Sequence, residues 1–290
     1  MLALVAHRRD GTNARLAEQG AVVLSPRAAL RSLTPGDVAV ARLDVRRTLD
    51  GIEPGLWTLR RLEQRGVHVL NSPDALLAMH DKLLTAMRLR HVNVPHPRSA
   101  YLHVGAAARS IELPAVIKPR FGSWGRQVHL CSTRAELRRC LRALHDATWF
   151  REQGALVQEL VPPTGCDLRV LVAGGEVVGA IERVAAPGEW RTNVALGGTR
   201  RPAIPGPRAR ALALAAAAAV GADLTGVDLL RMGRSYVVLE LNGAVDFTAE
   251  YSFDGEASSS GWRRRSRGGR CRRRRNNLFT TRSPRFDPPP

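Results

Sequence analysis

We expect this chain to fold as an α/β unit followed by α+β segments. Residues 1–70 contain four short apolar runs separated by helical stretches, the pattern of a small α/β unit. After residue 155 in the sequence, two pairs of strand-like runs are joined by short turns, which is typical of hairpins. With 290 residues, 44% hydrophobic and 24% charged, the chain can bury a sizeable core, and global disorder is excluded.

The N-terminal unit is predicted from four apolar runs that are short enough to be buried strands. They are Leu2–Ala6, Ala21–Leu24, Val38–Ala41 and Val67–Leu70. Neither GxGxxG nor GxxxxGK[ST] occurs, so the two commonest phosphate-binding loops are absent.

A helix is predicted to begin at Asn71-Ser-Pro-Asp74, because Ser72 suits the N-cap and Pro73 suits the first helical turn. We expect one continuous helix from Asp74 to Arg90, with Lys82 on it.

The middle of the chain predicts two strands, a loop and a helix. The strand Leu113–Arg120, whose exit is fixed by Pro119, leads into the small-residue loop Phe121–Arg126. A strand from Val128 to Cys131 follows, and Thr133-Arg-Ala-Glu136 forms a capping box that opens a helix.

Behind the strand Ala155–Leu160, the first predicted hairpin pairs two runs around Gly174-Gly175. These runs are 167–173 and 176–183. The alanine-rich run Ala211–Val220 predicts a buried helix. The second hairpin pairs Val227–Leu230 with Tyr236–Asn242.

The second hairpin carries a candidate metal site. Glu240 and Asn242 share one strand face, and Asp228 on the partner strand is expected to face them. Oxygen ligands of this kind suit Mg²⁺. The alternative is a hairpin whose polar face meets water, and spacing alone favours neither.

Lysine is rare in this chain. Of 44 basic residues only Lys82 and Lys118 are lysine, so these sites suggest a need for a compact point charge. Lys118 is at the end of a predicted strand shortly before the Gly-Ser-Trp-Gly loop, where small residues allow backbone N–H groups to approach an anion. The alternative is that the two lysines are there by chance.

Half of the net charge of +18 falls in residues 256–290, which hold 11 arginines and two acidic residues. One interpretation is a basic arm for nucleic acid. A second is that the reading frame is lost shortly after Gly255, since out-of-frame GC-rich sequence yields Arg, Gly, Ser and Pro.

No apolar run is long enough for a membrane span, no signal peptide or CxxC is present, and we expect a cytoplasmic protein.

Ten short motifs, from about residue 65 to 255, occur in the order seen in RimK-like ATP-grasp ligases, which the chain therefore resembles. They are Asn71-Ser-Pro, Asp81-Lys82, Ile117-Lys-Pro119, Gly122-Ser-x-Gly125, Gln158-Glu159, Asp167-x-Arg169, Glu182-Arg183, Arg191-Thr-Asn193, Gly226-Val-Asp228 and Glu240-Leu-Asn242. The resemblance implies the ATP-grasp fold, with a small N-terminal α/β domain (1–74), a first lobe with the phosphate loop (75–158) and a second lobe with the metal site (159–255). The arginine-rich segment 256–290 would follow.

The same resemblance implies an ATP-dependent carboxylate–amine ligase that works through an acylphosphate and releases ADP and phosphate. The implied ATP-binding residues are Lys82, Lys118, Gly122, Ser123, Gly125, Glu159, Leu160, Asp167, Arg191, Thr192 and Asn193. Asp228, Glu240 and Asn242 would hold two Mg²⁺ or Mn²⁺ ions. Arg183 and Arg191 would clamp the carboxylate of the amino-acid donor, although both could instead be surface arginines of a hairpin.

Three departures from the family pattern concern this site and its surroundings. Gln127 stands where many relatives have a third glycine, Gly243-Ala-Val-Asp-Phe replaces a common Pro-Gly turn, and the arginine-rich segment replaces an expected helix. The tryptophan in the Gly-Ser-Trp-Gly loop and the missing Pro-Gly turn resemble ligases of lysine or arginine biosynthesis that act on a carrier protein.

The expected partners are ATP, an amino-acid donor such as L-glutamate, and a peptide, protein or cofactor acceptor. A membrane is not expected as a partner, and a homo-oligomer stays open. The alternatives are a nucleic-acid-binding protein and an inactive nucleotide-binding homologue.

Overall fold

The N-terminal unit is a parallel sheet covered by helices. The computed structural model describes residues 1–7, 10–43, 54–105, 111–246 and 248–253. The strand order is β2-β1-β3-β4, and all neighbours are parallel. The strands are β1 (Leu2–Val5), β2 (Val22–Leu24), β3 (Val38–Ala41) and β4 (His68–Leu70), and the helices are α1 (Gly11–Glu18), α2 (Pro26–Ser32) and α3 (Pro54–Gln64). All four predicted strands are confirmed.

The predicted continuous helix Asp74–Arg90 is wrong, because the chain breaks at Asp81. Two helices result, α4 (Pro73–His80) and α5 (Lys82–His91). Asp81 has a ψ of 102° and its carboxylate accepts hydrogen bonds from the backbone N–H groups of Leu83 and Leu84. Asp81 therefore acts as the N-cap of α5. Lys82 becomes the first residue of that helix.

We call the next unit lobe 1; its antiparallel sheet has the order β5-β8-β6-β7. The strands are β5 (Ser99–Leu102), β6 (Ala115–Pro119), β7 (His129–Cys131) and β8 (Ala155–Glu159), and the helices are α6 (Arg134–His145) and α7 (Thr148–Gln153). The predicted capping box of Thr133 and Glu136 is confirmed at the start of α6. Strand β5 was not predicted.

We call the last described unit lobe 2; its five-stranded antiparallel sheet has the order β11-β10-β9-β12-β13. The elements are β9 (Cys166–Ala173), β10 (Glu176–Val184), β11 (Thr199–Pro202), α8 (Pro207–Val220), β12 (Leu224–Met232) and β13 (Ser235–Asn242). Both predicted hairpins and the predicted alanine-rich helix are confirmed. Strand β11 was not predicted.

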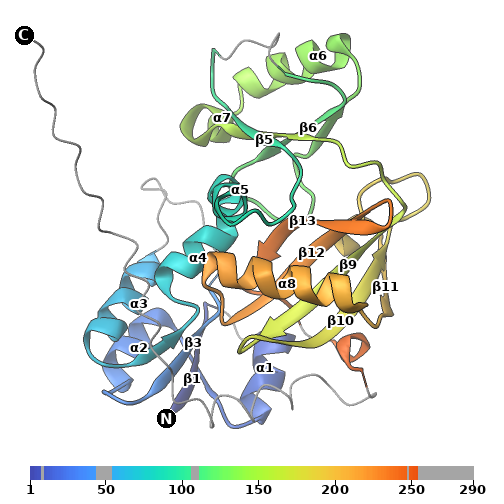
Figure 1. Ribbon diagram of the computed structural model, residues 1–290. Helices are drawn as coiled ribbons and strands as arrows, with labels where there is room; N and C mark the ends of the chain where they lie inside the picture. Colours follow the sequence, from blue (N-terminus) through green and yellow to red (C-terminus); the bar gives the residue numbers. More distant parts are fainter. Residues whose placement is uncertain (8–9, 44–53, 106–110, 247, 254–290) are drawn as a thin grey trace, which may run out of the picture.

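The N-terminal unit and lobe 2 share one apolar core, whereas lobe 1 has a core of its own. Figure 1 shows lobe 1 standing above lobe 2, with α5 at their junction. Asn71 ties the lower two units together by hydrogen bonds to Asp223 and Leu224. Among the described residues, every helix is too short or too polar to cross a bilayer. The arginine-rich segment, and with it the reading-frame hypothesis, lies outside the described residues.

Candidate functional site

A cleft lies between the two lobes and is lined by residues of both. The predicted site residues that line this cleft are Lys82, Lys118, Gly122, Ser123, Gly125, Glu159, Leu160, Asp167, Arg183, Arg191, Thr192, Asn193 and Glu240. Asp228 and Asn242 do not line it. The fold thus brings together residues that lie far apart in the sequence.

Lys118 lies at the end of β6 and is buried. Its Nζ donates a hydrogen bond of 2.8 Å to Oε1 of Gln158 on β8. Burial lowers the pKa of the Lys118 ammonium to about 8, although the nearby Glu240 carboxylate opposes this shift. A buried ammonium without a carboxylate in direct contact is a ready partner for a phosphate oxygen.

The small-residue loop of lobe 1 touches lobe 2. Arg191 donates a hydrogen bond of 2.7 Å from Nη1 to the carbonyl oxygen of Gly125. Gly125 has a φ of 68°, and a Cβ at this residue would lie 2.6 Å from Oδ1 of Asn193. Only glycine fits here without a shift of the loop. The loop therefore closes the cleft against Arg191 and Asn193.

Glu159 and Leu160 lie where β8 leaves lobe 1. The backbone N–H of Glu159 donates to Arg98, and that of Leu160 donates to Pro114 at 3.3 Å. The Glu159 carboxylate pairs with the Arg98 guanidinium at 2.8 Å, which lowers the pKa of that carboxyl. This segment is thus anchored within lobe 1 while it borders the cleft.

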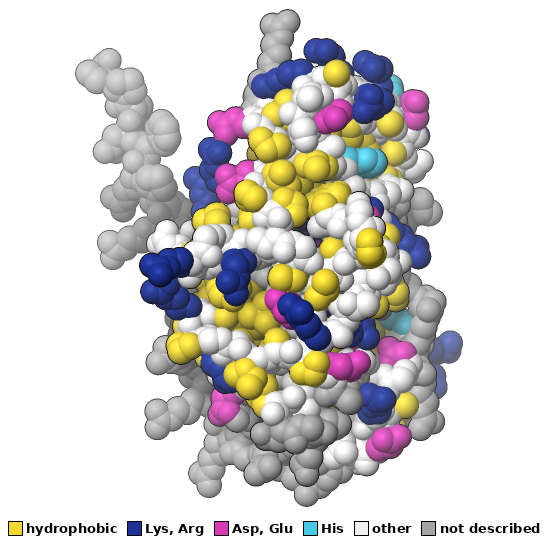
Figure 2. Space-filling model, turned by 90° about the vertical axis from the view of Figure 1, so that its right-hand side faces the viewer, with side chains coloured by type: hydrophobic (Ala, Val, Ile, Leu, Met, Phe, Trp, Pro, Cys, Tyr) yellow, Lys and Arg dark blue, Asp and Glu magenta, His cyan; other side chains and the backbone are white. Residues whose placement is uncertain are grey.

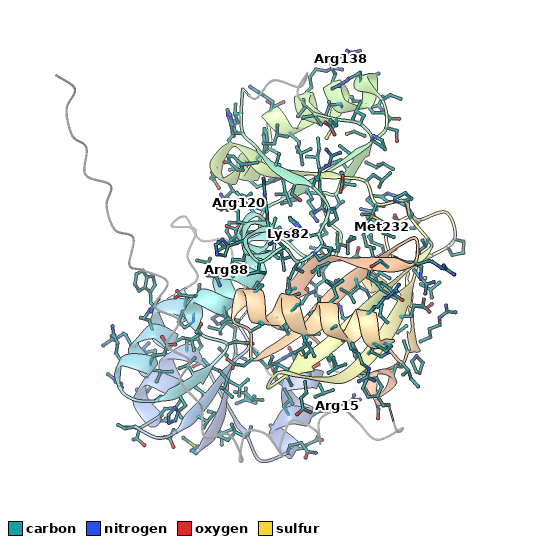
Figure 3. All side chains as sticks on the ribbon, viewed as in Figure 1. Arg15, Lys82, Arg88, Arg120, Arg138 and Met232 are labelled. Carbon is teal, nitrogen blue, oxygen red and sulfur yellow. The ribbon has the colours of Figure 1, made fainter. Side chains whose placement is uncertain are left out.

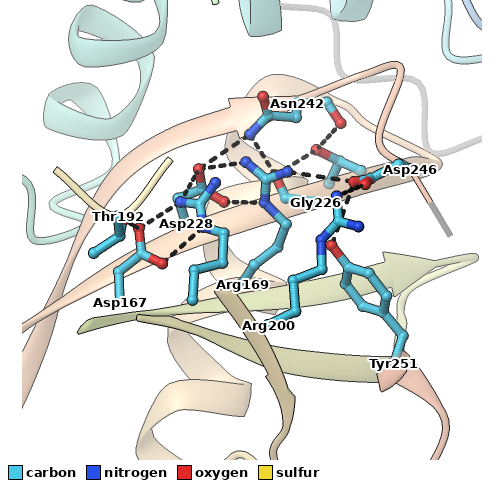
Figure 4. Close-up of polar contacts among 11 residues, drawn as sticks. Asp167, Arg169, Thr192, Arg200, Gly226, Asp228, Asn242, Asp246 and Tyr251 are labelled. Carbon is cyan, nitrogen blue, oxygen red and sulfur yellow. Dashed lines mark hydrogen bonds and ion pairs between the residues drawn. The ribbon is translucent and has the colours of Figure 1, made fainter. Parts of the chain in front are cut away.

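Arg183 is buried, so it is not a surface arginine. Its guanidinium joins the carboxylates of Asp167 and Asp228, the latter at 2.8 Å. Both aspartates are labelled in Figure 4. Thr192 donates a hydrogen bond of 2.7 Å from Oγ1 to Asp167. Asp167, implied by the resemblance to be an ATP-binding residue, lines the cleft and is engaged by these two side chains.

The register of β12 and β13 pairs Asp228 with Glu240, as predicted. Both oxygens of Asp228 also accept hydrogen bonds from Arg169, at 2.6 and 2.8 Å. Burial raises the pKa of Asp228, but the charges of Arg169 and Arg183 outweigh it and lower the pKa to about 2. Asn242 faces Asp228 through its amide nitrogen at 3.4 Å. The pairing of Asp228 with Arg169 and Arg183 was not predicted from the sequence.

The donor chemistry of Asp228, Glu240 and Asn242 fits a hard divalent cation, because carboxylate and amide oxygens are its preferred ligands. Asp228 and Glu240 are paired in register across the β12–β13 hairpin. Among the described residues, no three His, Cys, Asp or Glu side chains form a metal-binding group. The metal assignment stays a prediction.

Residues 81–253, more than half of the chain, match the family described as the RimK-like ATP-grasp domain. The chain belongs to this family. The two-lobed architecture with a parallel N-terminal sheet is therefore the ATP-grasp fold, and the predicted fold class is confirmed.

Two curated relatives resemble this ATP-grasp chain in sequence. One is a "Probable alpha-L-glutamate ligase" of Serratia proteamaculans, 36% identical over 196 residues, which are 66% of this chain and 64% of the relative. The other is a ribosomal protein bS6–L-glutamate ligase of Salmonella paratyphi B, 35% identical over 202 residues with the same coverage of both chains. The match spans about 64% of the length of these relatives.

Solved ATP-grasp structures share the fold. A RimK domain ATP-grasp protein from Sphaerobacter thermophilus superimposes with a TM-score of 0.67 at 21% identity, covering 90% of this chain and 97% of that one. The ligase PsnB, solved with a minimal precursor, Mg and ADP, gives a TM-score of 0.64 at 20% identity, covering 91% and 97%.

Two departures from the ATP-grasp pattern have a structural explanation. Gln127 adopts a φ of 56°, the left-handed conformation that a third glycine would adopt more easily. In the segment that replaces the Pro-Gly turn, the Val245 carbonyl accepts a hydrogen bond from Arg42, and Asp246 pairs with Arg200. This ATP-grasp chain thus fixes the segment by arginines rather than by proline.

Proposed function

We propose that this chain is an ATP-dependent carboxylate–amine ligase that adds L-glutamate to a peptide or protein acceptor. One observation carries the proposal: both lysines of the chain, the glycine loop and Glu240 border one cleft between two lobes. The names of the two curated glutamate ligases support the choice of amino acid and of a protein acceptor. We also propose the domain boundaries 1–74, 75–158 and 159–255.

In this proposal, Lys82 and Lys118 neutralise the phosphates of ATP, and the backbone of Gly122, Ser123 and Gly125 approaches them closely. The segment Glu159-Leu160 borders the adenine. Attack of a carboxylate on the γ-phosphoryl group brings two anions together, so positive charge fixed beforehand lowers the barrier. The product of this step is an acylphosphate and ADP.

Asp228, Glu240 and Asn242 are the residues that would hold Mg²⁺ or Mn²⁺, and we propose two ions. Such ions supply positive charge that neutralises the phosphate oxygens during transfer. Arg183, held between Asp167 and Asp228, lines the cleft, and in this proposal it pairs with a donor carboxylate.

An amine, of either the acceptor or the amino acid, then attacks the acylphosphate carbonyl, and phosphate leaves. Water must be kept out at this stage, or the intermediate is hydrolysed. The contact between Arg191 and the Gly125 carbonyl supports this role, because it closes the glycine loop over the cleft. Thr192 and Asn193 directly follow Arg191 in the sequence and line the same cleft from lobe 2.

The experiment is an assay of ADP release with Mg·ATP, in which amino acids are screened against candidate acceptor peptides. We expect turnover with L-glutamate, and loss of turnover in both Asp228→Ala and Glu240→Ala. Wild-type turnover in both variants would overturn the metal assignment. Nucleotide binding without any ADP release would favour an inactive homologue.

The nucleic-acid alternative predicts steeply salt-dependent binding that disappears when residues 256–290 are deleted. On the face shown in Figure 2, basic side chains are dispersed among acidic and hydrophobic ones and do not form a continuous stripe. Retention of nucleotide binding in the 1–255 chain would separate the two functions.

A further inference from the structure

Arg120 lies next to the candidate phosphate site but points away from it. It follows β6 two residues after Lys118 and directly precedes the glycine loop. Its side chain does not line the cleft. Instead, its guanidinium pairs with Asp81 through two hydrogen bonds, the one from Nε measuring 3.1 Å. The Arg120 guanidinium is therefore already paired with a carboxylate of the protein itself.

Asp81, the partner of Arg120, is the residue that starts α5. Its side chain is nearly buried, and its Oδ1 accepts from the backbone N–H groups of Leu83 and Leu84 as well as from Arg120. A carboxylate that both caps a helix and receives a bidentate guanidinium is fixed in orientation.

A second contact ties the same two segments together through the backbone. The N–H of Lys82 donates a hydrogen bond of 3.1 Å to the carbonyl oxygen of Arg120. Arg120 thus holds the first residue of α5 by its main chain and the preceding residue by its side chain. Figure 3 shows Arg120 and Lys82 together at this end of α5, below lobe 1.

The aromatic neighbours of Arg120 complete its immobilisation. Its guanidinium carbon lies 5.6 Å from the ring centre of Tyr101 and 5.5 Å from that of Phe121, within the range of cation–π contacts. The Lys82 ammonium, in turn, donates to the carbonyl oxygen of Gly122 in the glycine loop. Lys82 and Lys118 both line the cleft, and the charge of Lys82 lowers the pKa of Lys118.

We propose that Arg120 is a positioning residue for Lys82: by clamping Asp81, it sets the place of the Lys82 ammonium relative to Lys118. The inference rests on the proposed function and deepens it, because two ammonium groups at a fixed spacing recognise a polyphosphate rather than a nucleoside. Arg120 acts through Lys82 and touches no substrate itself.

The experiment is a double-mutant cycle that measures the dissociation constants of Mg·ATP and of adenosine by calorimetry. We expect Arg120→Met and Asp81→Asn each to weaken ATP binding about 10-fold, as for the loss of one charge-assisted contact. Adenosine binding is expected to stay unchanged. In the Lys82→Met background, Arg120→Met is expected to add no further loss, since the residue it positions is gone.

Arg138→Met on the exposed face of α6 is the matched control, with wild-type affinity for both ligands. Arg120→Lys keeps the charge but not the bidentate geometry, so it tests the proposal even if Arg120→Met unfolds. Additive losses in the cycle, or wild-type ATP binding in Arg120→Lys and Asp81→Asn, would overturn the positioning role while leaving the ligase intact. If Lys82→Met itself binds ATP normally, both this role and the phosphate site of the proposed function fail.

Discussion

Lys118 and Gln158 are joined across the β6–β8 pair by a hydrogen bond of 2.8 Å, in which the buried ammonium donates to the amide oxygen. Gln158 in turn donates to Ser99 on β5. A neutral acceptor holds Lys118 in place without cancelling its charge, and burial lowers the pKa of Lys118 to about 8. The residue is thus fixed in direction, and its ammonium loses its proton at a lower pH than an exposed lysine.

The first prediction is proton uptake on ATP binding. Phosphate oxygens favour the charged ammonium and raise the pKa of Lys118 above about 8. At pH 8 the free lysine is about half neutral, so binding takes up about half a proton. Below pH 7 this uptake vanishes, and above pH 8 the affinity falls as pH rises.

Calorimetry in two buffers with different ionisation enthalpies measures this uptake. Lys118→Met is the control, because it retains the titration of ATP itself. Equal binding heats in the two buffers at pH 8 for the wild type, after subtraction of that control, would contradict the prediction.

The second prediction concerns the kind of charge at this residue. Lys118→Arg keeps a cation but places a larger planar group in a buried site next to Gln158. We expect ATP binding to weaken by about 10- to 100-fold, and ADP release to fall with it. Arg138→Lys, on the exposed face of α6, should leave both unchanged. Wild-type affinity in Lys118→Arg would mean that point-charge geometry is not required.

The third prediction tests closure of the glycine loop. Gly125→Ala places a Cβ 2.6 Å from Asn193 Oδ1, so we expect the loop to move away from Arg191 and ADP release to fall about 10-fold or more. Gly188→Ala is a matched control, since Gly188 has a similar φ of 78° but an added Cβ would meet nothing within 4 Å. Both variants place a Cβ on a residue with a positive φ, but only in Gly125→Ala does that Cβ also come too close to a neighbouring atom. Equal activity loss in the two would attribute the effect to strain alone.

The fourth prediction separates the two carboxylates of the candidate metal site. Asp228→Asn leaves the buried guanidinium groups of Arg169 and Arg183 short of a counter-charge, which we expect to cost about 3–5 kcal/mol of unfolding free energy. Glu240→Gln, at a half-buried residue, should cost about 1 kcal/mol or less. Urea unfolding measures the difference, and ADP release should be lost in both.

The pH dependence of Asp228 has a definite sign. Its pKa in the folded protein, about 2, lies below the ordinary value of 3.8, so its contribution to stability is full above pH 4 and is lost as pH falls toward 2. Asp228→Asn should therefore flatten unfolding free energy against pH in this acid range. A wild-type slope in that variant would show that other carboxyls are responsible.

Much of the fold follows from local patterns. The four N-terminal strands, the capping box at Thr133 and the two hairpins each depend on residues within one short segment. The pairing of Asp228 with Glu240 was predictable for the same reason, because a hairpin register is set by its turn and its alternation. The edge strand β11 was missed because Thr199-Arg-Arg-Pro202 has no apolar alternation.

The break at Asp81 was missed because the helical periodicity continues through it. What interrupts the helix is a carboxylate that prefers two backbone amides and the guanidinium of Arg120, 39 residues away. Likewise, Arg169 belongs to a recognised motif, but its pairing with Asp228, 59 residues away, leaves no signal in spacing or charge.

The sequence by itself determined the four N-terminal strands, the capping box of lobe 1, the two hairpins of lobe 2, the family, and the two lysines as candidate phosphate contacts. Only the tertiary structure decided that Asp228 is enclosed by two arginines, that Arg183 is buried, and that the Gly125 loop rests on Arg191. The physical reason is the separation along the chain over which each effect acts. Periodicity and capping act over a few residues, whereas the partner of a buried charge is chosen by how β9, β10 and β12 pack and by how lobe 1 meets lobe 2.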